Sequence, residues 1–134
     1  MSEERKISKE YEAIGLEAIK NEPSLQTLRN SACKIIYLLS DKAKTKGGNT
    51  VFAQCEKVPD KLQWAINADM LVVIFEPNVE NFSREQKYAL MHHELLHINV
   101  KYSKDGEESY GTRPHDYEDF KEIIDKYGTD WCRT

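Results

Sequence analysis

The chain has 134 residues, of which 40% are hydrophobic and 31% are charged, and its formal net charge is -4. This length suits a single domain over residues 1–134, and the acidic balance excludes a broad basic footprint for nucleic acid, although a local basic patch remains compatible with it. No apolar run is long enough to span a bilayer and the charged N-terminus lacks a signal-peptide core, so we expect a cytoplasmic protein without a membrane partner.

The N-terminal part of the chain predicts two helices. Residues 1–10 are almost all polar, and we expect them to be flexible. Apolar residues at helical spacing predict a first helix over residues 11–19, which Pro23 ends. Ser24 is a suitable N-cap for a second helix that reaches about Lys44. The apolar stripe of this second helix consists of Leu25, Leu28, Ala32, Ile35, Ile36 and Leu39.

The middle of the chain changes to the period of β-strands. Alternating residues over 50–58 predict a strand, and a second strand could cover residues 62–66. The unbroken apolar run Met70–Phe75 predicts a third strand that is buried on both faces.

The C-terminal part predicts a central helix, a loop and a last helix. Ser83 and Gln86 stand three residues apart, as in a capping box, and begin a helix that should run to about Val100. This helix is apolar on most sides, which is typical of a buried helix. A polar loop follows over 104–113, and residues 116–127 predict the last helix. The pattern as a whole indicates an α+β fold: N-terminal helices, a small β-sheet, a buried central helix and a C-terminal helix.

The central helix carries the pattern H-E-x-x-H as His93, Glu94 and His97. Residues four apart lie about 40° apart around a helix, so both imidazoles can converge on one ion. Zinc accepts such nitrogen ligands and lowers the pKa of a bound water to about 7. Glu94 projects to the side, where its carboxylate can take the proton of that water. The alternative is a chance pattern on a core helix, but buried imidazoles and a buried carboxylate would then need other partners.

The third zinc ligand must come from outside this pattern. His92 lies about 100° from His93 around the helix, so we interpret it as a flanking polar residue or as a partner for a carboxylate. His115 follows the polar loop and could fold back to the ion. The rival ligands are the carboxylates that come after it: Asp116, Glu118 and Asp119. Asp116 could instead accept a hydrogen bond from a ligand imidazole.

Tyr110 and Arg113, which precede His115 in the chain, are candidates for stabilising a transition state. The phenol of Tyr110 or the guanidinium of Arg113 could bind the oxyanion of a tetrahedral intermediate. The alternative interpretation is a solvated loop without a catalytic role.

The three cysteines are widely spaced, and no two of them form a CxxC pair. This spacing argues against a cysteine-rich zinc site and against a disulfide scaffold. A reducing compartment, such as the cytoplasm, is the simplest interpretation.

The order of these motifs resembles the putative phage metallopeptidase family, whose members look like small zincins and are distantly similar to SprT-like proteases. The segments that carry the resemblance are HELLH at residues 93–97 and Pro114-His115-Asp116 followed by Phe120. The resemblance implies a zincin-like fold with His93 and His97 as zinc ligands, Glu94 as the general base and a third ligand at His115. It also implies that the cytoplasm in question could be that of a phage-infected host.

We therefore expect a zinc-dependent hydrolase that cleaves peptide bonds in a peptide or protein substrate. One alternative is a non-catalytic module whose zinc site is closed by a fourth ligand, from Glu118 or Cys132. Another is a metal hydrolase of a different amide or of an ester. The distant similarity to SprT-like proteases suggests one more alternative, a DNA-associated role. Such a role would appear as salt-dependent DNA binding. Imidazole ligands also suit iron, nickel and copper, and the sequence does not predict an oligomeric state.

Overall fold

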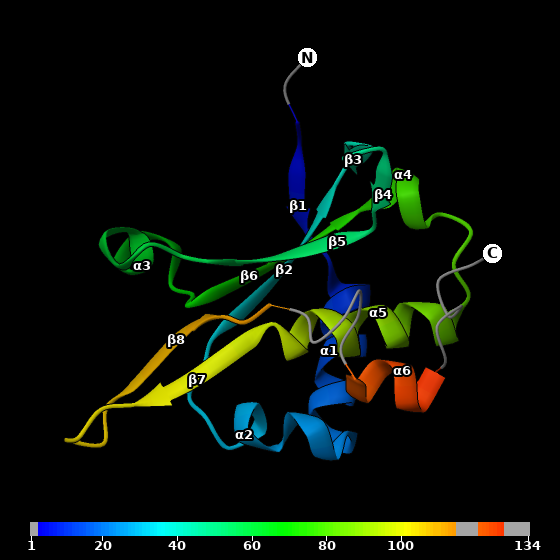
Figure 1. Cartoon of the computed structure of the whole chain (residues 1–134). Helices are drawn as coiled ribbons and strands as arrows, with labels where there is room; N and C mark the ends of the chain where they lie inside the picture. Colours follow the sequence, from blue (N-terminus) through cyan, green and yellow to red (C-terminus); the bar gives the residue numbers. More distant parts are fainter. Residues whose placement is uncertain (1–2, 115–120, 128–134) are drawn as a thin grey trace.

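A computed structural model describes residues 3–114 and 121–127 (Figure 1). The helices are α1 (Lys9–Asn21), α2 (Gln26–Arg29), α3 (Gln63–Ile66), α4 (Glu76–Val79), α5 (Arg84–Leu96) and α6 (Lys121–Tyr127). The strands are β1 (Arg5–Ile7), β2 (Ile35–Ser40), β3 (Lys44–Lys46), β4 (Asn49–Val51), β5 (Ala53–Lys57), β6 (Met70–Phe75), β7 (Ile98–Tyr102) and β8 (Glu108–Thr112). Short 3-10 turns lie at Pro23–Leu25 and Asp60–Leu62. The mixture of helices and sheets confirms the α+β class.

The main sheet has the strand order β1-β2-β6-β5 within the described residues. β2 and β6 are parallel, and Ile35 lies opposite Met70 and Ser40 opposite Phe75. β1 and β5 are antiparallel to their neighbours at the two edges. The predicted strand Met70–Phe75 is confirmed as β6, and five of its six side chains are buried. β-Branched residues suit such a central strand because they pack well on a pleated surface.

Helices α1 and α5 pack together beneath one face of this sheet (Figure 1). The predicted first helix is confirmed as α1, and its residues Tyr11, Ile14 and Ala18 are each at most 2% exposed. The side chains that meet between the helices and the sheet form one hydrophobic cluster. It includes Tyr11, Ile14, Ala18, Tyr37, Met70, Val72, Ile74, Leu90, Met91 and Leu95.

The start of α5 has the predicted capping box. The Ser83 hydroxyl accepts a hydrogen bond from the Gln86 amide at 3.2 Å, and the Gln86 side chain accepts one from the Ser83 amide at 2.8 Å. These reciprocal bonds satisfy two backbone donors that a helix terminus otherwise leaves without partners. The helix is thus held at its start, and residues 89–96 at its other end are all buried.

The predicted helix from Ser24 to Lys44 is wrong. The structure has a 3-10 turn and the short helix α2, which ends at Arg29, and then strand β2 over Ile35–Ser40. The side chains at positions 35, 36 and 39 fit helical spacing by coincidence. A short apolar run does not distinguish a strand from a helix, and here pairing with β1 and β6 selects the strand.

Three further predictions of secondary structure are wrong. Residues 62–66 lie in a 3-10 turn and α3, not in a strand, because Leu62 donates its amide to Pro59 and Asn67 closes the turn in a left-handed conformation. The central helix ends at Leu96, well before Val100. The expected loop over 104–113 is largely strand β8, which pairs with β7.

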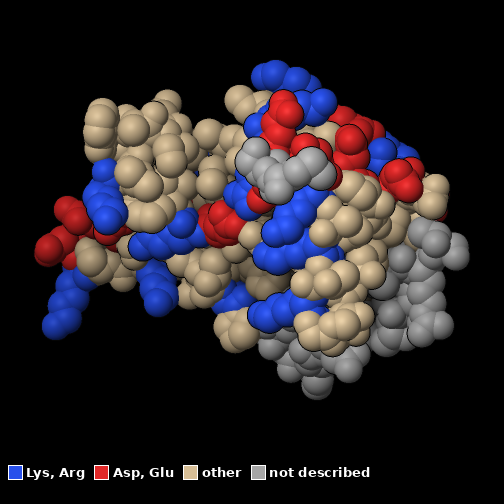
Figure 2. Space-filling model, turned by 90° about the horizontal axis from the view of Figure 1, so that it is seen from above, with Lys and Arg blue, Asp and Glu red and all other residues tan. Residues whose placement is uncertain are grey.

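The polar N-terminus also contributes to the sheet. Residues 5–7, within the segment expected to be flexible, form β1 against β2. The Arg5 guanidinium lies 2.8 Å from Glu3 and 3.7 Å from Glu56 of β5. Figure 2 shows this side of the molecule, where basic and acidic side chains lie interspersed. Within the described residues, no helix has the length and apolar character that crossing a membrane requires.

Candidate metal centre

The last turn of α5 brings together three side chains of types that can ligate a metal. Donor atoms of His93, Glu94 and His97 all lie within 4.8 Å of one another. The two imidazole rings have centroids 5.2 Å apart and are inclined at 69°. This convergence is what residues four apart on a helix produce. His97 is the C-cap of α5, which ends at Leu96, and it keeps helical dihedral angles.

Two side chains of this cluster are buried, and His97 is partly exposed. Glu94 is 3% exposed and His93 is 9% exposed, and their Oε2 and Nε2 atoms lie 3.6 Å apart. Burial in a medium of low polarity strengthens electrostatic interactions between such groups. The cluster also lies at the C-terminal end of a helix, where the helix dipole favours a positive charge.

Arg113 fixes the end of α5 and the orientation of His97. Its amide donates to the His97 carbonyl at 2.7 Å, and its side-chain Nε donates to the Leu96 carbonyl at 2.8 Å. Its own carbonyl lies 2.8 Å from Nδ1 of His97. A carbonyl can only accept, so Nδ1 of His97 donates, and in a neutral ring Nε2 is then the nitrogen that can ligate a metal. Such a bond on the second ring nitrogen typically accompanies histidine ligation of a metal.

These features fit a metal ion. Two nitrogen ligands at roughly 2.0–2.1 Å from one zinc ion lie at most about 4.2 Å apart. The donor atoms of the cluster lie within 4.8 Å of one another, so small side-chain movements can bring both imidazoles to one ion. His93 and His97 offer imidazole nitrogens, which zinc accepts as ligands, and Glu94 adds a buried carboxylate beside them. The described donors are fewer than the ligands of a complete zinc site, so a further ligand is needed.

His92 belongs to a different cluster on another side of α5. Its Nε2 lies 2.6 Å from the Ser24 hydroxyl, its Nδ1 lies 3.1 Å from the Tyr127 hydroxyl, and the Glu22 carboxylate is 3.8 Å away. The interpretation of His92 as a partner for a carboxylate is therefore confirmed. Glu22, Ser24 and Tyr127 were not identified from the sequence, because nothing local connects them with His92.

Glu22 is the charged centre of this second cluster. It is 6% exposed and accepts hydrogen bonds from the Tyr88 hydroxyl at 2.6 Å and from Lys126. Burial by itself raises the pKa of Glu22, but the hydrogen bonds from Lys126 and Tyr88 outweigh it and the pKa is lowered. The carboxylate is thus ionised and joins the end of α1 to α5 and α6.

The other predicted site residues have varied positions. Tyr110 lies on β8, where its phenol donates to Glu108 on the same strand. Its role at an oxyanion stays a prediction.

Five other candidates from the sequence lie outside the described residues: His115, Asp116, Glu118, Asp119 and Cys132. Cys33 and Cys55 are free and partly buried, and burial raises the pKa of both thiols, which suits core residues.

Comparison with known proteins gives one family. The model of a family described as "Putative phage metallopeptidase" matches residues 4–134. No curated protein and no solved structure matches the chain. The matched range includes the helix that carries His93, Glu94 and His97 as well as the segment after Arg113.

Proposed function

Because this chain belongs to the putative phage metallopeptidase family, we propose that it is a zinc-dependent metallopeptidase with a zincin-like fold. Membership of a peptidase family implies a metal and a peptide or protein substrate. The observation that carries the proposal is the convergence of His93, Glu94 and His97 at the C-terminal end of α5.

His93 and His97 would hold the ion, and we propose His115 as the third ligand, with Asp116 as the first alternative. When bound, zinc supplies a Lewis acid that makes water acidic enough to ionise near neutral pH and that polarises a carbonyl group. The Nδ1–H of His97 stays bonded to the Arg113 carbonyl, and this bond orients the ring.

Glu94 is the proposed general base and acid. Its carboxylate takes a proton from the attacking water as the oxygen adds to the carbonyl carbon of the peptide bond. It then gives this proton to the nitrogen of the leaving amine as the carbon–nitrogen bond breaks. The burial of Glu94 supports this role. Little bulk water reaches the buried carboxylate, so other waters compete less with the reacting water for its proton.

The variant Glu94→Gln tests this function. The amide keeps the shape of the side chain but cannot take the proton, so we expect kcat/KM for peptide hydrolysis to fall by at least about 100-fold. Zinc content should stay unchanged, because the amide removes neither imidazole. Cleavage of quenched fluorescent peptides and elemental analysis of the same samples measure both quantities.

Glu85→Gln is the matched control, since Glu85 is an exposed carboxylate on the first turn of the same helix. It should leave hydrolysis unchanged. A Glu94→Gln protein that still cleaves peptides at the wild-type rate would contradict the role of Glu94. Zinc-loaded wild-type protein that cleaves esters or other amides, but no peptide, would indicate a different hydrolase. A zinc-loaded wild type that cleaves none of these substrates would indicate a structural ion.

A further inference from the structure

Polar side chains attach the last helix, α6, to α1 and to the helix that carries the candidate metal centre. The Tyr127 hydroxyl lies 3.1 Å from Nδ1 of His92, and the Lys126 ammonium group donates to the carboxylate of Glu22, the C-cap of α1. The Tyr88 hydroxyl of α5 donates to the same carboxylate at 2.6 Å, and the Lys126 ammonium group lies over the Tyr88 ring. Two consecutive residues of α6 thus contact both α1 and α5.

This attachment is largely buried. His92 is 2% exposed and Glu22 is 6% exposed, and Ile123 of α6 is fully buried in the hydrophobic core. Separating a buried carboxylate from its partners is costly, because it leaves a charge uncompensated in a medium of low polarity. α6 is therefore held firmly alongside α5 (Figure 1), at a histidine that directly precedes the candidate ligand His93.

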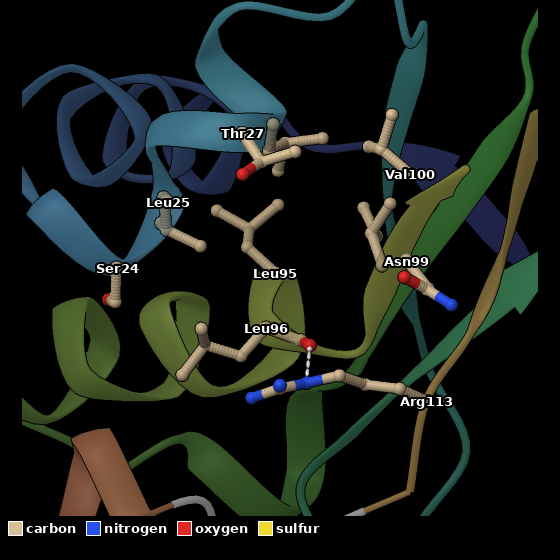
Figure 3. Close-up of a pocket in the computed structure, with 10 residues that line it drawn as sticks. Ser24, Leu25, Thr27, Leu95, Leu96, Asn99, Val100 and Arg113 are labelled. Atoms are coloured by element: carbon tan, nitrogen blue, oxygen red, sulfur yellow. Dashed lines mark hydrogen bonds between the residues drawn. The ribbon is translucent and has the colours of Figure 1, made fainter. Parts of the chain in front are cut away.

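A second attachment to α5 lies at Arg113, before α6 in the chain. The Arg113 amide donates to the His97 carbonyl, and its side chain donates to the Leu96 carbonyl, as the close-up in Figure 3 shows for the side chain. Residues 114–120 connect Arg113 with the start of α6, so the chain is attached to α5 on both sides of this segment. The segment contains the candidates for the third metal ligand: His115, Asp116, Glu118 and Asp119.

Attachment on both sides affects how readily a third ligand binds an ion. A ligand on a freely moving chain must be ordered from many conformations, and this ordering weakens binding. A second attachment point confines the segment and raises the effective concentration of its side chains near the ion. The two attachments therefore favour a ligand from residues 114–120 at His93 and His97.

We propose that Lys126 and Tyr127, through their contacts with Glu22 and His92, position the third metal ligand and thereby control how tightly the ion is bound. This inference rests on the proposed function, and it deepens it by naming a control on the metal affinity of the same site. Lys126 and Tyr127 are positioning residues: they supply no ligand and act through the chain that precedes α6.

Zinc affinity, measured by competition with a chelator of known affinity, tests this proposal without requiring turnover. Lys126→Met and Tyr127→Phe remove the polar contacts and keep most of each side chain, and each should weaken zinc binding by about tenfold. Lys87→Met is the matched control for the lysine, because Lys87 also pairs with a carboxylate of α1, Glu10, and lies over a tyrosine ring, but at the start of α5. Tyr102→Phe, which removes a hydroxyl bonded to a carboxylate on the β7–β8 hairpin, is the control for the tyrosine. Both controls should bind zinc as the wild type does.

A double-mutant cycle separates positioning of the ligand from a general loss of stability. Its second site is whichever candidate ligand in residues 114–120 weakens zinc binding most when it is replaced by alanine. In that background the third ligand is already absent, so Tyr127→Phe should weaken zinc binding by less than about twofold. The same cycle with Lys126→Met carries the test should Tyr127→Phe fold poorly.

Equal losses of affinity with and without the third ligand would assign a merely structural role to the two residues and overturn the proposal. Wild-type affinity in both Lys126→Met and Tyr127→Phe would overturn it as well. A wild type that binds zinc, with no alanine variant in residues 114–120 weakening the binding, would overturn the positioning role and leave the zinc site intact. A wild type that binds no zinc would overturn the proposed function, and the inference with it.

Discussion

The two ring nitrogens of His97 are in different environments, and this difference has a chemical consequence. Nδ1 donates to the Arg113 carbonyl, so Nε2 is the nitrogen that can ligate a metal, and the orientation of the ring is set by Arg113. The Arg113 side chain in turn binds the Leu96 carbonyl. Arg113 is therefore a positioning residue, and it acts on the site through His97.

Arg113→Ala should weaken zinc affinity by about tenfold, the lower end of the range for groups that orient metal ligands. The main-chain bonds to His97 remain in this variant, which is why the loss is not larger. Competition with a chelator of known affinity measures the effect. Lys101→Ala, on the exposed part of β7, is the control and should bind zinc as the wild type does.

The value of kcat for Arg113→Ala, compared with its zinc affinity, separates positioning of His97 from the oxyanion role that the sequence suggested for Arg113. A fall in kcat with unchanged zinc affinity would assign the guanidinium to the transition state. Unchanged kcat and affinity would mean that the main-chain bonds alone orient His97.

At the scale of single residues, the sequence predicted what depends on local geometry. The convergence of His93 and His97 follows from helical spacing and could be predicted. The partners of these residues could not, because the Arg113 carbonyl is a backbone group 16 residues away and carries no sequence signal. Glu22 escaped notice for the same reason, since only the packing of α1 on α5 brings it to His92.

At the scale of elements, helices and strands were predicted correctly where the length and the residue types of a segment both favoured the same structure. Strand β6 and the capped start of α5 have strong local signals, and both were predicted. β2 was predicted as part of a helix, because its six residues show a spacing compatible with either structure. Long-range pairing with β1 and β6 decides between them, and a sequence pattern does not contain that pairing.

The contact between α1 and β2 leads to a prediction at Gly15. A Cβ atom there would come within 2.4 Å of the Tyr37 hydroxyl and 2.5 Å of its ring. Replacing glycine by alanine inside a helix normally stabilises it by about 1 kcal/mol. Here overpacking should dominate, and we expect Gly15→Ala to lower the free energy of unfolding by about 1–3 kcal/mol in urea titrations.

Ala13→Gly is a suitable comparison, because Ala13 is exposed on the same helix and reports intrinsic helix propensity alone. Ala13→Gly should lower the free energy of unfolding by about 1 kcal/mol. Gly15→Ala and Ala13→Gly are thus both expected to destabilise, although they are opposite substitutions. A more stable Gly15→Ala protein would show that α1 does not pack on Tyr37 as described.

At the scale of the whole molecule, the cluster around Glu22 joins segments that are far apart in the chain. Tyr88 belongs to α5, Lys126 and Tyr127 belong to α6, and Glu22 is the C-cap of α1. The hydrophobic core packs helices on the sheet, whereas this polar cluster connects the helices with one another. Its charge makes the connection sensitive to pH.

Glu22→Gln should lower the free energy of unfolding at pH 7 by about 1–3 kcal/mol, because a hydrogen-bonded charge is replaced by a neutral amide. The folded state lowers the pKa of Glu22, so its ionised form contributes stability above the unfolded pKa of about 4.3. This contribution is lost as the pH falls from there through the folded pKa.

Unfolding free energies measured between pH 7 and pH 3 should therefore converge for the wild type and Glu22→Gln at the acid end. Glu17→Gln, which removes an exposed carboxylate paired with Arg84, should follow the wild-type pH profile. A constant difference between Glu22→Gln and the wild type across the pH range would contradict the lowered pKa.

The metal content per chain tests the proposed zinc site on His93 and His97. Elemental analysis is made on protein without a histidine tag, after zinc has been supplied, for the wild type, His97→Ala and His115→Ala. We predict about one zinc per chain in the wild type and much less in both variants. Full zinc in His115→Ala alone would move the third ligand to Asp116 or another carboxylate. A wild type that stays free of metal would contradict the claim and leave His93, Glu94 and His97 as a chance pattern on a core helix.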